Sequence, residues 1–216
     1  GPGNSTRLLA DRWPDADVVG IDSSETMLER ARTDHPDVRF ELGDMTKWSP
    51  DEPVDVLFAN ASLHWLPDHP ATLRPLLEHV ATGGSLAMQI PNNSDQPSHA
   101  EARRIVRERF ADLDGILSDR PVFTLEQHYD ALAGPRVVVD VWESTYLQPL
   151  DGPKRIVEWT SGTFLRPLLG ALADDPDRRQ AFLAAYGDAM AAAYPTGADG
   201  MVLLPFPRLF AVATKR

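Results

Sequence analysis

The first half of the chain alternates short apolar runs with segments in which apolar residues recur at helical spacing. Four apolar or alternating runs predict strands: 18–21 ending at Asp22, 38–42 ending at Asp44, 54–59, and 85–90. Two segments between them predict helices: 25–32, and 73–80 stopped by Gly83 and Gly84. The continuous apolar run 54–59 is typical of a central parallel strand with both faces covered. This order of elements predicts a parallel sheet with right-handed crossovers.

The second half of the chain is mostly helical. A polar loop over 92–98 is followed by predicted amphipathic helices around 100–110 and 125–133, and by further helices within 153–194. Residues 137–147 alternate as a strand with one exposed side. Two apolar runs close the chain, 201–204 and 209–214, and the second predicts the last strand. We therefore expect one α/β domain whose last two strands are separated by a helical insertion.

The composition of the chain excludes some classes of binding partner and some kinds of site. The 216 residues carry 21 Lys and Arg against 32 Asp and Glu, a formal net charge of -11, so the field of the protein repels polyanions. Nucleic acid and anionic membrane are therefore not expected partners. The absence of cysteine excludes disulfides, thiolate metal sites and a cysteine nucleophile. With no run of about 18 apolar residues and no secretory signal pattern, we expect a cytoplasmic protein.

Polar residues follow the ends of successive predicted strands, which is where open parallel sheets bind ligands. The chain opens with GPGNST, in which glycines allow the backbone to approach a ligand closely. Asp22 lies 19 positions after Gly3, at a spacing that suits a carboxylate accepting hydrogen bonds from both hydroxyls of a ribose. Asp44 beside Met45 offers an acceptor next to an apolar side chain, as an adenine ring requires. Asn60 follows the next strand.

Each of these residues also has a purely structural interpretation. GPG is a common turn, and Gly1 with Pro2 fits a remnant of an expression vector. Asp22 and Asp44 fit ordinary helix caps or turn residues. Residues that only cap helices would not be expected at the end of each successive strand. The glycines at the start of the chain, followed by Asp22 and Asp44 at strand ends, therefore favour a nucleoside-binding site.

Five segments carry a family resemblance: GPGNST, VVGIDSSETML, FELGDMTKW, VLFANASLHWLPDH and PFPRLFAVA. In them the chain resembles the S-adenosylmethionine-dependent trans-aconitate methyltransferases, and the similarity runs through nearly all of its length. The resemblance implies a Rossmann-like class I methyltransferase sheet, parallel with an antiparallel last strand, and a helical cap insertion. It also implies methyl transfer from S-adenosylmethionine to a carboxylate of trans-aconitate, giving a monomethyl ester and S-adenosylhomocysteine.

The resemblance also implies a set of cofactor-binding residues: Gly1, Gly3, Asp22, Ser23, Asp44, Met45 and Asn60. The two glycines match the later glycines of the cofactor loop. Asp22 matches the acid that holds the ribose, and Asp44 with Met45 matches the adenine contact. Asn60 matches a residue near the methionine moiety and the reacting centre.

The family pattern suggests a layout for the single methyltransferase domain expected over 1–216. We expect a cofactor-binding half at 1–92, a helical segment at 93–135, a strand at 136–150, a helical cap insertion at 151–199 and the last strand at 200–216. Members of the family begin with a helical segment and a strand that leads into the glycine loop, whereas this chain starts inside that loop. We therefore expect the first strand to be missing from this chain and the natural protein to be longer.

Methyl transfer to a carboxylate requires alignment more than acid or base catalysis, because the oxygen is already ionised at pH 7. No catalytic acid or base is therefore expected, and no histidine lies at metal-ligand spacing from acids, so no metal is expected. The remaining carboxylates of a tricarboxylate require cations. The candidates are Arg166 in TSGTFLRPLL and Arg208 in PFPRLF, supported by His64, Gln89, Tyr146 and Trp159. Structural roles for Arg166, Arg208 and Trp159 are the competing interpretation.

Several alternatives remain open. One is a methyltransferase acting on another small carboxylic acid or on a hydroxyl compound. Another is an NAD-dependent oxidoreductase, because glycines followed by an acid at this spacing also fit that cofactor. A third is a non-catalytic cofactor-binding protein. On the main interpretation the partner is a small polycarboxylate substrate, and the chain acts as a monomer.

Overall fold

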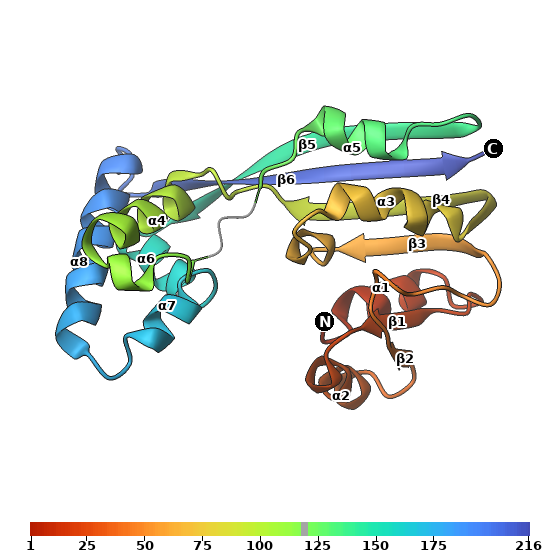
Figure 1. Cartoon of the computed structure of the whole chain (residues 1–216), viewed down its shortest axis with the longest axis horizontal. Coiled ribbons are helices and arrows are strands. Elements are labelled where there is room, and N and C mark those ends of the chain that lie inside the picture. Colours follow the sequence, from red (N-terminus) through yellow and green to blue (C-terminus); the bar gives the residue numbers. More distant parts are fainter. Residues whose placement is uncertain (118–120) are drawn as a thin grey trace. The chain divides into compact units, whose positions relative to one another are not determined.

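The computed structural model describes residues 1–117 and 121–216, and the chain divides into two compact units (Figure 1). Unit 1 contains Gly1–Gln89, Tyr129–Asp140 and Ala211–Arg216, and unit 2 contains Ile90–His128 and Val141–Phe210. Within the described residues, no helix has both the length and the apolar content needed to cross a membrane.

The elements alternate in the first half and become mainly helical in the second. The helices are α1 (Asn4–Arg12), α2 (Glu25–Asp34), α3 (His69–Glu78), α4 (Pro97–Arg109), α5 (Leu125–Leu132), α6 (Lys154–Ser161), α7 (Arg166–Ala171) and α8 (Pro176–Ala193). The strands are β1 (Val19–Asp22), β2 (Arg39–Leu42), β3 (Val54–Asn60), β4 (Val80–Pro91), β5 (Val137–Leu150) and β6 (Val202–Lys215). Two short 3-10 turns are η1 (Leu63–Trp65) and η2 (Ala111–Leu113).

Strands β1 and β2 form a two-stranded parallel sheet in unit 1, in which Asp22 pairs with Leu42. Helix α2 connects them and packs Leu28 and Ala31 against Phe40. Ser24 caps α2 by accepting a hydrogen bond from a backbone N–H of its first turn. The predicted strand, helix and second strand of this region are therefore confirmed.

The remaining strands form a four-stranded sheet in the order β3-β4-β6-β5. Strands β3 and β4 are parallel, and β6 runs opposite to β4, so the expected antiparallel last strand is confirmed (Figure 1). The sequence predicted one sheet, whereas the described strands form two. Strands β1 and β3 each have a hydrogen-bonded neighbour on one side only, so no described strand connects the two sheets.

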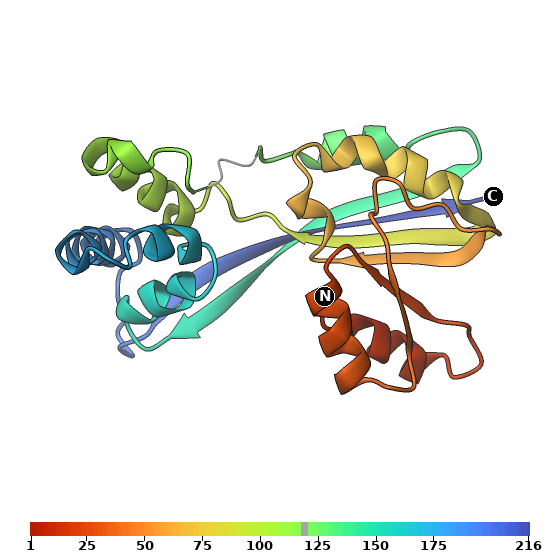
Figure 2. The ribbon, with the colours of Figure 1, turned by 60° about the horizontal axis from the view of Figure 1, so that its bottom comes forward.

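Strand β3 is an edge strand, contrary to the expectation of a central one. Figure 2 shows α3 over one face of the β3–β4 pair, and Ala59 is buried. Side chains alternate between the two faces of a strand, so Val56 and Phe58 lie on the face opposite to Ala59. Val56 is 53% exposed there and Phe58 is 42% exposed. A continuous apolar run reports the polarity of the residues and not the number of neighbouring strands, so it could not identify the edge position.

The end of α3 also differs from the prediction. The apolar spacing extends the helix to Val80, but α3 ends at Glu78 and Val80 begins β4. Val80 is fully buried and pairs with Val54, and a buried β-branched residue favours a strand. Gly83, with φ of 85°, and Gly84 lie inside β4, where the register shifts, rather than between two elements.

The two apolar runs near the C-terminus form one strand, β6, instead of two separate segments. Pro205 and Pro207 lie inside it. The fixed φ of proline is compatible with extended backbone, and each proline removes only one N–H donor. The carbonyl of Pro207 still accepts a hydrogen bond from the N–H of Asn92, at 2.9 Å.

The core of unit 2 is built mainly by α4, α6, α7 and α8. Phe182 on α8 is fully buried, with its ring edge-on to Phe110 at 5.9 Å and stacked on Tyr186 at 5.9 Å. The Tyr186 hydroxyl donates to the carbonyl of Ser98 at 2.7 Å, and the Tyr194 hydroxyl accepts from the Ser98 N–H at 3.0 Å. Two tyrosines of the C-terminal half therefore fix the start of α4.

His99, next to this anchor, makes the stability of the protein depend on pH. Burial, and then the nearby charge of Arg103, lower the pKa of His99 to about 4. Its ring packs on Phe164 at 4.3 Å. The folded protein keeps the imidazole neutral, whereas the unfolded chain binds a proton as the pH falls below 6.5. As the pH falls from 6.5 to 4, we expect this group to lower the free energy of unfolding by up to about 3 kcal/mol. Above pH 6.5 the imidazole is neutral in both states, so the group has no effect there.

The measurement is urea unfolding of the protein and of His99→Phe across this pH range. Phenylalanine keeps a ring against Phe164 but cannot bind a proton. The variant should lose this part of the pH dependence, and an unchanged slope would show that His99 does not cause it.

Candidate functional site

The carboxyl end of β1 presents Asp22 and Ser23. Asp22 is half-buried, and its Oδ1 accepts a hydrogen bond from the Ser24 N–H at 2.8 Å. Its Oδ2 contacts the ammonium group of Gly1. Ser23 is exposed beside it. The turn therefore fixes one carboxylate oxygen and directs the other toward the start of the chain.

Asp44 and Met45 follow the adjacent strand β2. The Gly43 N–H donates to the backbone carbonyl of Asp22 at 3.0 Å, so the two turns are tied together. The Asp44 carboxylate accepts hydrogen bonds from the backbone N–H of Thr46 at 2.9 Å and from its hydroxyl at 2.8 Å. These bonds lower the pKa of Asp44, which keeps the carboxylate ionised at neutral pH. Met45 is half-buried next to it. The structure thus brings Asp22 and Asp44 to neighbouring strand ends.

Gly3 occupies a position that only glycine can fill without rearrangement. It is the N-cap residue of α1, with φ of 85°. No side chain caps this helix at its N-terminus. A Cβ added at Gly3 would lie 2.8 Å from the rings of both His35 and Phe40. Glycine is therefore required at this position by the packing of the His35 and Phe40 rings.

Asn60 joins the end of β3 to the first turn of α1. Its Nδ2 donates to the Oγ of Ser5 at 3.1 Å. Asn60 is paired in register with Gln89 of β4, and the next residue, Ala61, has φ of 50° and donates its N–H to the Gln89 carbonyl at 2.8 Å. The role of Ser5 was not predicted, because nothing in the sequence signals a bond across 55 positions.

The six candidate substrate residues fall in both units. His64 in η1 is half-buried, with its ring 4.9 Å from that of Trp65, and Gln89 is 6% exposed; both belong to unit 1. The other four belong to unit 2. Tyr146 on β5 is 53% exposed, and Arg166 is an exposed residue at the start of α7.

Trp159 and Arg208 share a partner, Phe206, that sequence reasoning missed. The rings of Trp159 and Phe206 are 5.9 Å apart, and the guanidinium carbon of Arg208 lies 4.8 Å from the Phe206 ring centroid. Stacking on an aromatic face holds the planar guanidinium in place while its edge can still donate hydrogen bonds. The signal was present in PFPRLF, where the phenylalanine precedes the arginine by two positions and so shares its face of the strand.

The residues at the strand ends of unit 1 fit a nucleoside-bearing cofactor. Asp22 and Asp44 supply carboxylate acceptors, and Met45 supplies an apolar side chain. Ligands of α/β sheets bind outside the carboxyl ends of parallel strands, which is where these residues lie.

Comparison with known proteins identifies the family. The family model described as "Methyltransferase domain" matches residues 1–84. A trans-aconitate 2-methyltransferase of Azoarcus sp. (strain BH72) is 47% identical over 215 residues, covering 100% of this chain and 84% of that protein.

Two solved structures share the fold at low sequence identity. The YcgJ protein from Bacillus subtilis is 14% identical, with a TM-score of 0.55 over 92% of this chain and 82% of that one. The plantazolicin methyltransferase BpumL is 16% identical, with a TM-score of 0.52 over 100% of this chain and 74% of that one. The identity across the whole chain decides the classification: this chain belongs to the trans-aconitate 2-methyltransferase family.

Proposed function

We propose that this chain transfers the methyl group of S-adenosylmethionine to a carboxylate of trans-aconitate, giving a monomethyl ester and S-adenosylhomocysteine. The observation that carries the proposal is the similarity, along the whole chain, to relatives named for this reaction. The two carboxylates at neighbouring strand ends support it, because they suit the ribose and adenine of the cofactor.

The proposed cofactor residues each have a distinct role. Asp22 accepts hydrogen bonds from the ribose hydroxyls, assisted by the exposed Ser23. Asp44 and Met45 hold the adenine by an acceptor and an apolar contact. Gly1 and Gly3 belong to the glycine loop that contacts the cofactor. Asn60, held by Ser5, lies at the end of β3 and orients the reacting end of the cofactor.

Rate enhancement comes from alignment in this proposal. The bound cofactor supplies a methyl group already activated on a positively charged sulfur. The chain holds the ionised carboxylate oxygen of the substrate in line with that methyl group and keeps water out. Such positioning contributes on the order of 7 to 11 kcal/mol in favourable cases. No side chain has to remove a proton.

The proposed clamp for the other two carboxylates uses Arg166 and Arg208. Arg208 is held on Phe206, whose ring also contacts Trp159, so its orientation is restricted before substrate binds. Tyr146, His64 and Gln89 supply further polar groups. We also propose that the enzyme is a cytoplasmic monomer, and light scattering of the purified chain tests its oligomeric state.

The experiment that tests the reaction starts with calorimetric titration of the 216-residue chain with S-adenosylhomocysteine, using NAD as the competing cofactor. Turnover is then measured with labelled S-adenosylmethionine and a panel of acids that contains trans-aconitate. Binding of S-adenosylhomocysteine with fastest transfer to trans-aconitate is the expected result. Faster transfer to another acid would change the substrate, and binding of NAD alone would exclude a methyltransferase.

Arg166→Ala is expected to raise the KM for trans-aconitate while leaving the Kd of S-adenosylhomocysteine unchanged. Loss of one charge-assisted hydrogen bond to a carboxylate costs about 2 kcal/mol, or roughly thirtyfold. The matched control is Arg155→Ala on α6, which removes an exposed arginine paired with Glu158 at 2.7 Å. If cofactor binding falls in parallel with substrate binding, Arg166 has a structural role.

A further inference from the structure

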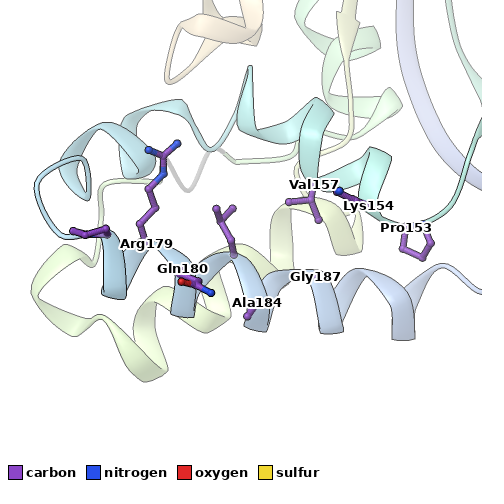
Figure 3. Close-up of a pocket in the computed structure, with 9 residues that line it drawn as sticks. Pro153, Lys154, Val157, Arg179, Gln180, Ala184 and Gly187 are labelled. Atoms are coloured by element: carbon purple, nitrogen blue, oxygen red, sulfur yellow. The ribbon is translucent and has the colours of Figure 1, made fainter.

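A groove of about 680 Å³ lies between α6 and α8 in unit 2 (Figure 3). Its lining residues all belong to these two helices or to the proline that precedes α6. None of them is a proposed cofactor or substrate residue. The surface of the groove is almost entirely apolar, and Val157, Leu183 and Ala184 contribute to it.

The groove exists because α8 is apolar on more than one side. Phe182, Tyr186 and Met190 on this helix are fully buried in the core of unit 2. Leu183 and Ala184 follow Phe182 in the sequence but line the groove. Leu183 is half-buried and Ala184 is exposed. Apolar side chains on a helix are expected to be covered, and those that the core does not reach leave apolar surface for another contact. One side of α8 therefore has apolar surface beyond what the core covers.

The charged residues that line the groove indicate what kind of molecule it can bind. The groove is lined by Lys154 and Arg179, with the amide of Gln180, and by no carboxylate, although the whole chain has a net charge of -11. Figure 3 shows Arg179 at one end of the row of labelled residues and Lys154 near the other end, next to Pro153. Both are exposed, and neither forms an ion pair within the described part of the chain. The groove therefore complements an anion that also has apolar surface.

We propose that this groove binds an amphipathic carboxylate with a medium-length alkyl chain. The alkyl chain lies along Val157, Leu183 and Ala184, and the carboxylate accepts hydrogen bonds from the guanidinium of Arg179, whose fork matches carboxylate geometry. The volume falls in the range of about 300 to 1,000 Å³ that is usual for small-molecule sites, and an apolar lining with a few polar groups is their usual character. A small, fully ionised tricarboxylate does not fit this apolar surface, so the site is separate from the proposed reaction.

The first test is calorimetric titration of the 216-residue chain with decanoate. Decanol has the alkyl chain without the charge, and acetate has the charge without the chain. Decanoate is expected to bind at least about tenfold more tightly than either of them. Absence of decanoate binding, or equal binding of decanol, would overturn the proposal.

Gly187 provides a position at which a side chain can be added to fill the groove. It lines the groove on α8, and a Cβ added there meets no heavy atom within 4 Å. Gly187→Leu is therefore expected to keep the melting temperature and to reduce decanoate affinity at least about tenfold. Gly170→Leu on α7 is the matched control, because its Cβ also meets nothing within 4 Å and it does not line the groove. Equal effects of the two variants would contradict the proposal.

A second pair of variants tests the charge. Arg179→Gln is expected to weaken decanoate binding about tenfold, while Arg155→Gln, which lies on α6 outside the lining, should leave it unchanged. Sedimentation of the same proteins tests the other occupant. If the chain is a dimer that Gly187→Leu dissociates, and decanoate does not bind, the groove holds a second copy and the proposal is wrong. Neither result depends on methyl transfer, so the two proposals fail separately.

Discussion

Asp22→Ala is expected to weaken S-adenosylhomocysteine binding by roughly hundredfold. The proposed role of Asp22 is to accept hydrogen bonds from both ribose hydroxyls, and a hydrogen bond to a charged group contributes about 1.5 to 3 kcal/mol. Loss of two such bonds corresponds to about 3 kcal/mol or more, which is at least a hundredfold in Kd. Calorimetric titration measures the effect directly.

Asp22→Asn separates the cofactor role of this residue from its local structural role. The amide oxygen of asparagine can still accept the Ser24 N–H bond that Oδ1 makes at 2.8 Å, so the turn after β1 is retained. Only the charge and one acceptor are lost, and we expect about tenfold weaker binding. Asp51→Asn, at an exposed position in the same unit, is the control and should bind normally. If both Asp22 variants bind like the unmodified chain, the ribose assignment is wrong.

Phe182→Ala is expected to cause a large loss of stability. The side chain is fully buried, and its ring contacts those of Phe110 and Tyr186. Removing a buried aromatic ring costs about 3 to 5 kcal/mol, because both the transfer free energy and the packing around the cavity are lost. For a chain of this size that lowers the melting temperature by roughly 10 °C, measured by calorimetry.

Leu203→Ala provides the comparison for this substitution. Leu203 belongs to the same unit, on β6, but is 51% exposed, so its truncation should change stability by no more than about 0.5 kcal/mol. A melting temperature of Phe182→Ala within about 2 °C of that of Leu203→Ala would show that the unit 2 core does not depend on α8.

Local elements were predictable where the signal lies in neighbouring residues. The strand that ends at Asp22, the helix that begins at Glu25 and the helices of the second half follow from apolar spacing, and the structure confirms them. The family was also predictable, because segments such as ANASLHWLPDH are far more specific than a glycine motif, and the comparisons confirm it.

Properties set by distant partners were not predictable. The exposure of Val56 and Phe58 depends on how many strands flank β3, which the sequence of that strand does not encode. The continuation of β6 through two prolines depends on the strands beside it. The same limit applies to the site: strand ends could be located, but the bond between Asn60 and Ser5 could not. The roles of the site residues stay predictions.

The division of the chain between the two units has an evolutionary consequence. The chain passes from one unit to the other four times, after Gln89, His128, Asp140 and Phe210, and three of these passages lie inside β4, β5 and β6. Neither unit is a contiguous stretch of sequence, so a single recombination event cannot exchange one for that of another gene. Exchange of one unit between two genes would require several crossover points, most of them inside strands, whereas a point substitution or a loop insertion changes one unit without any of them.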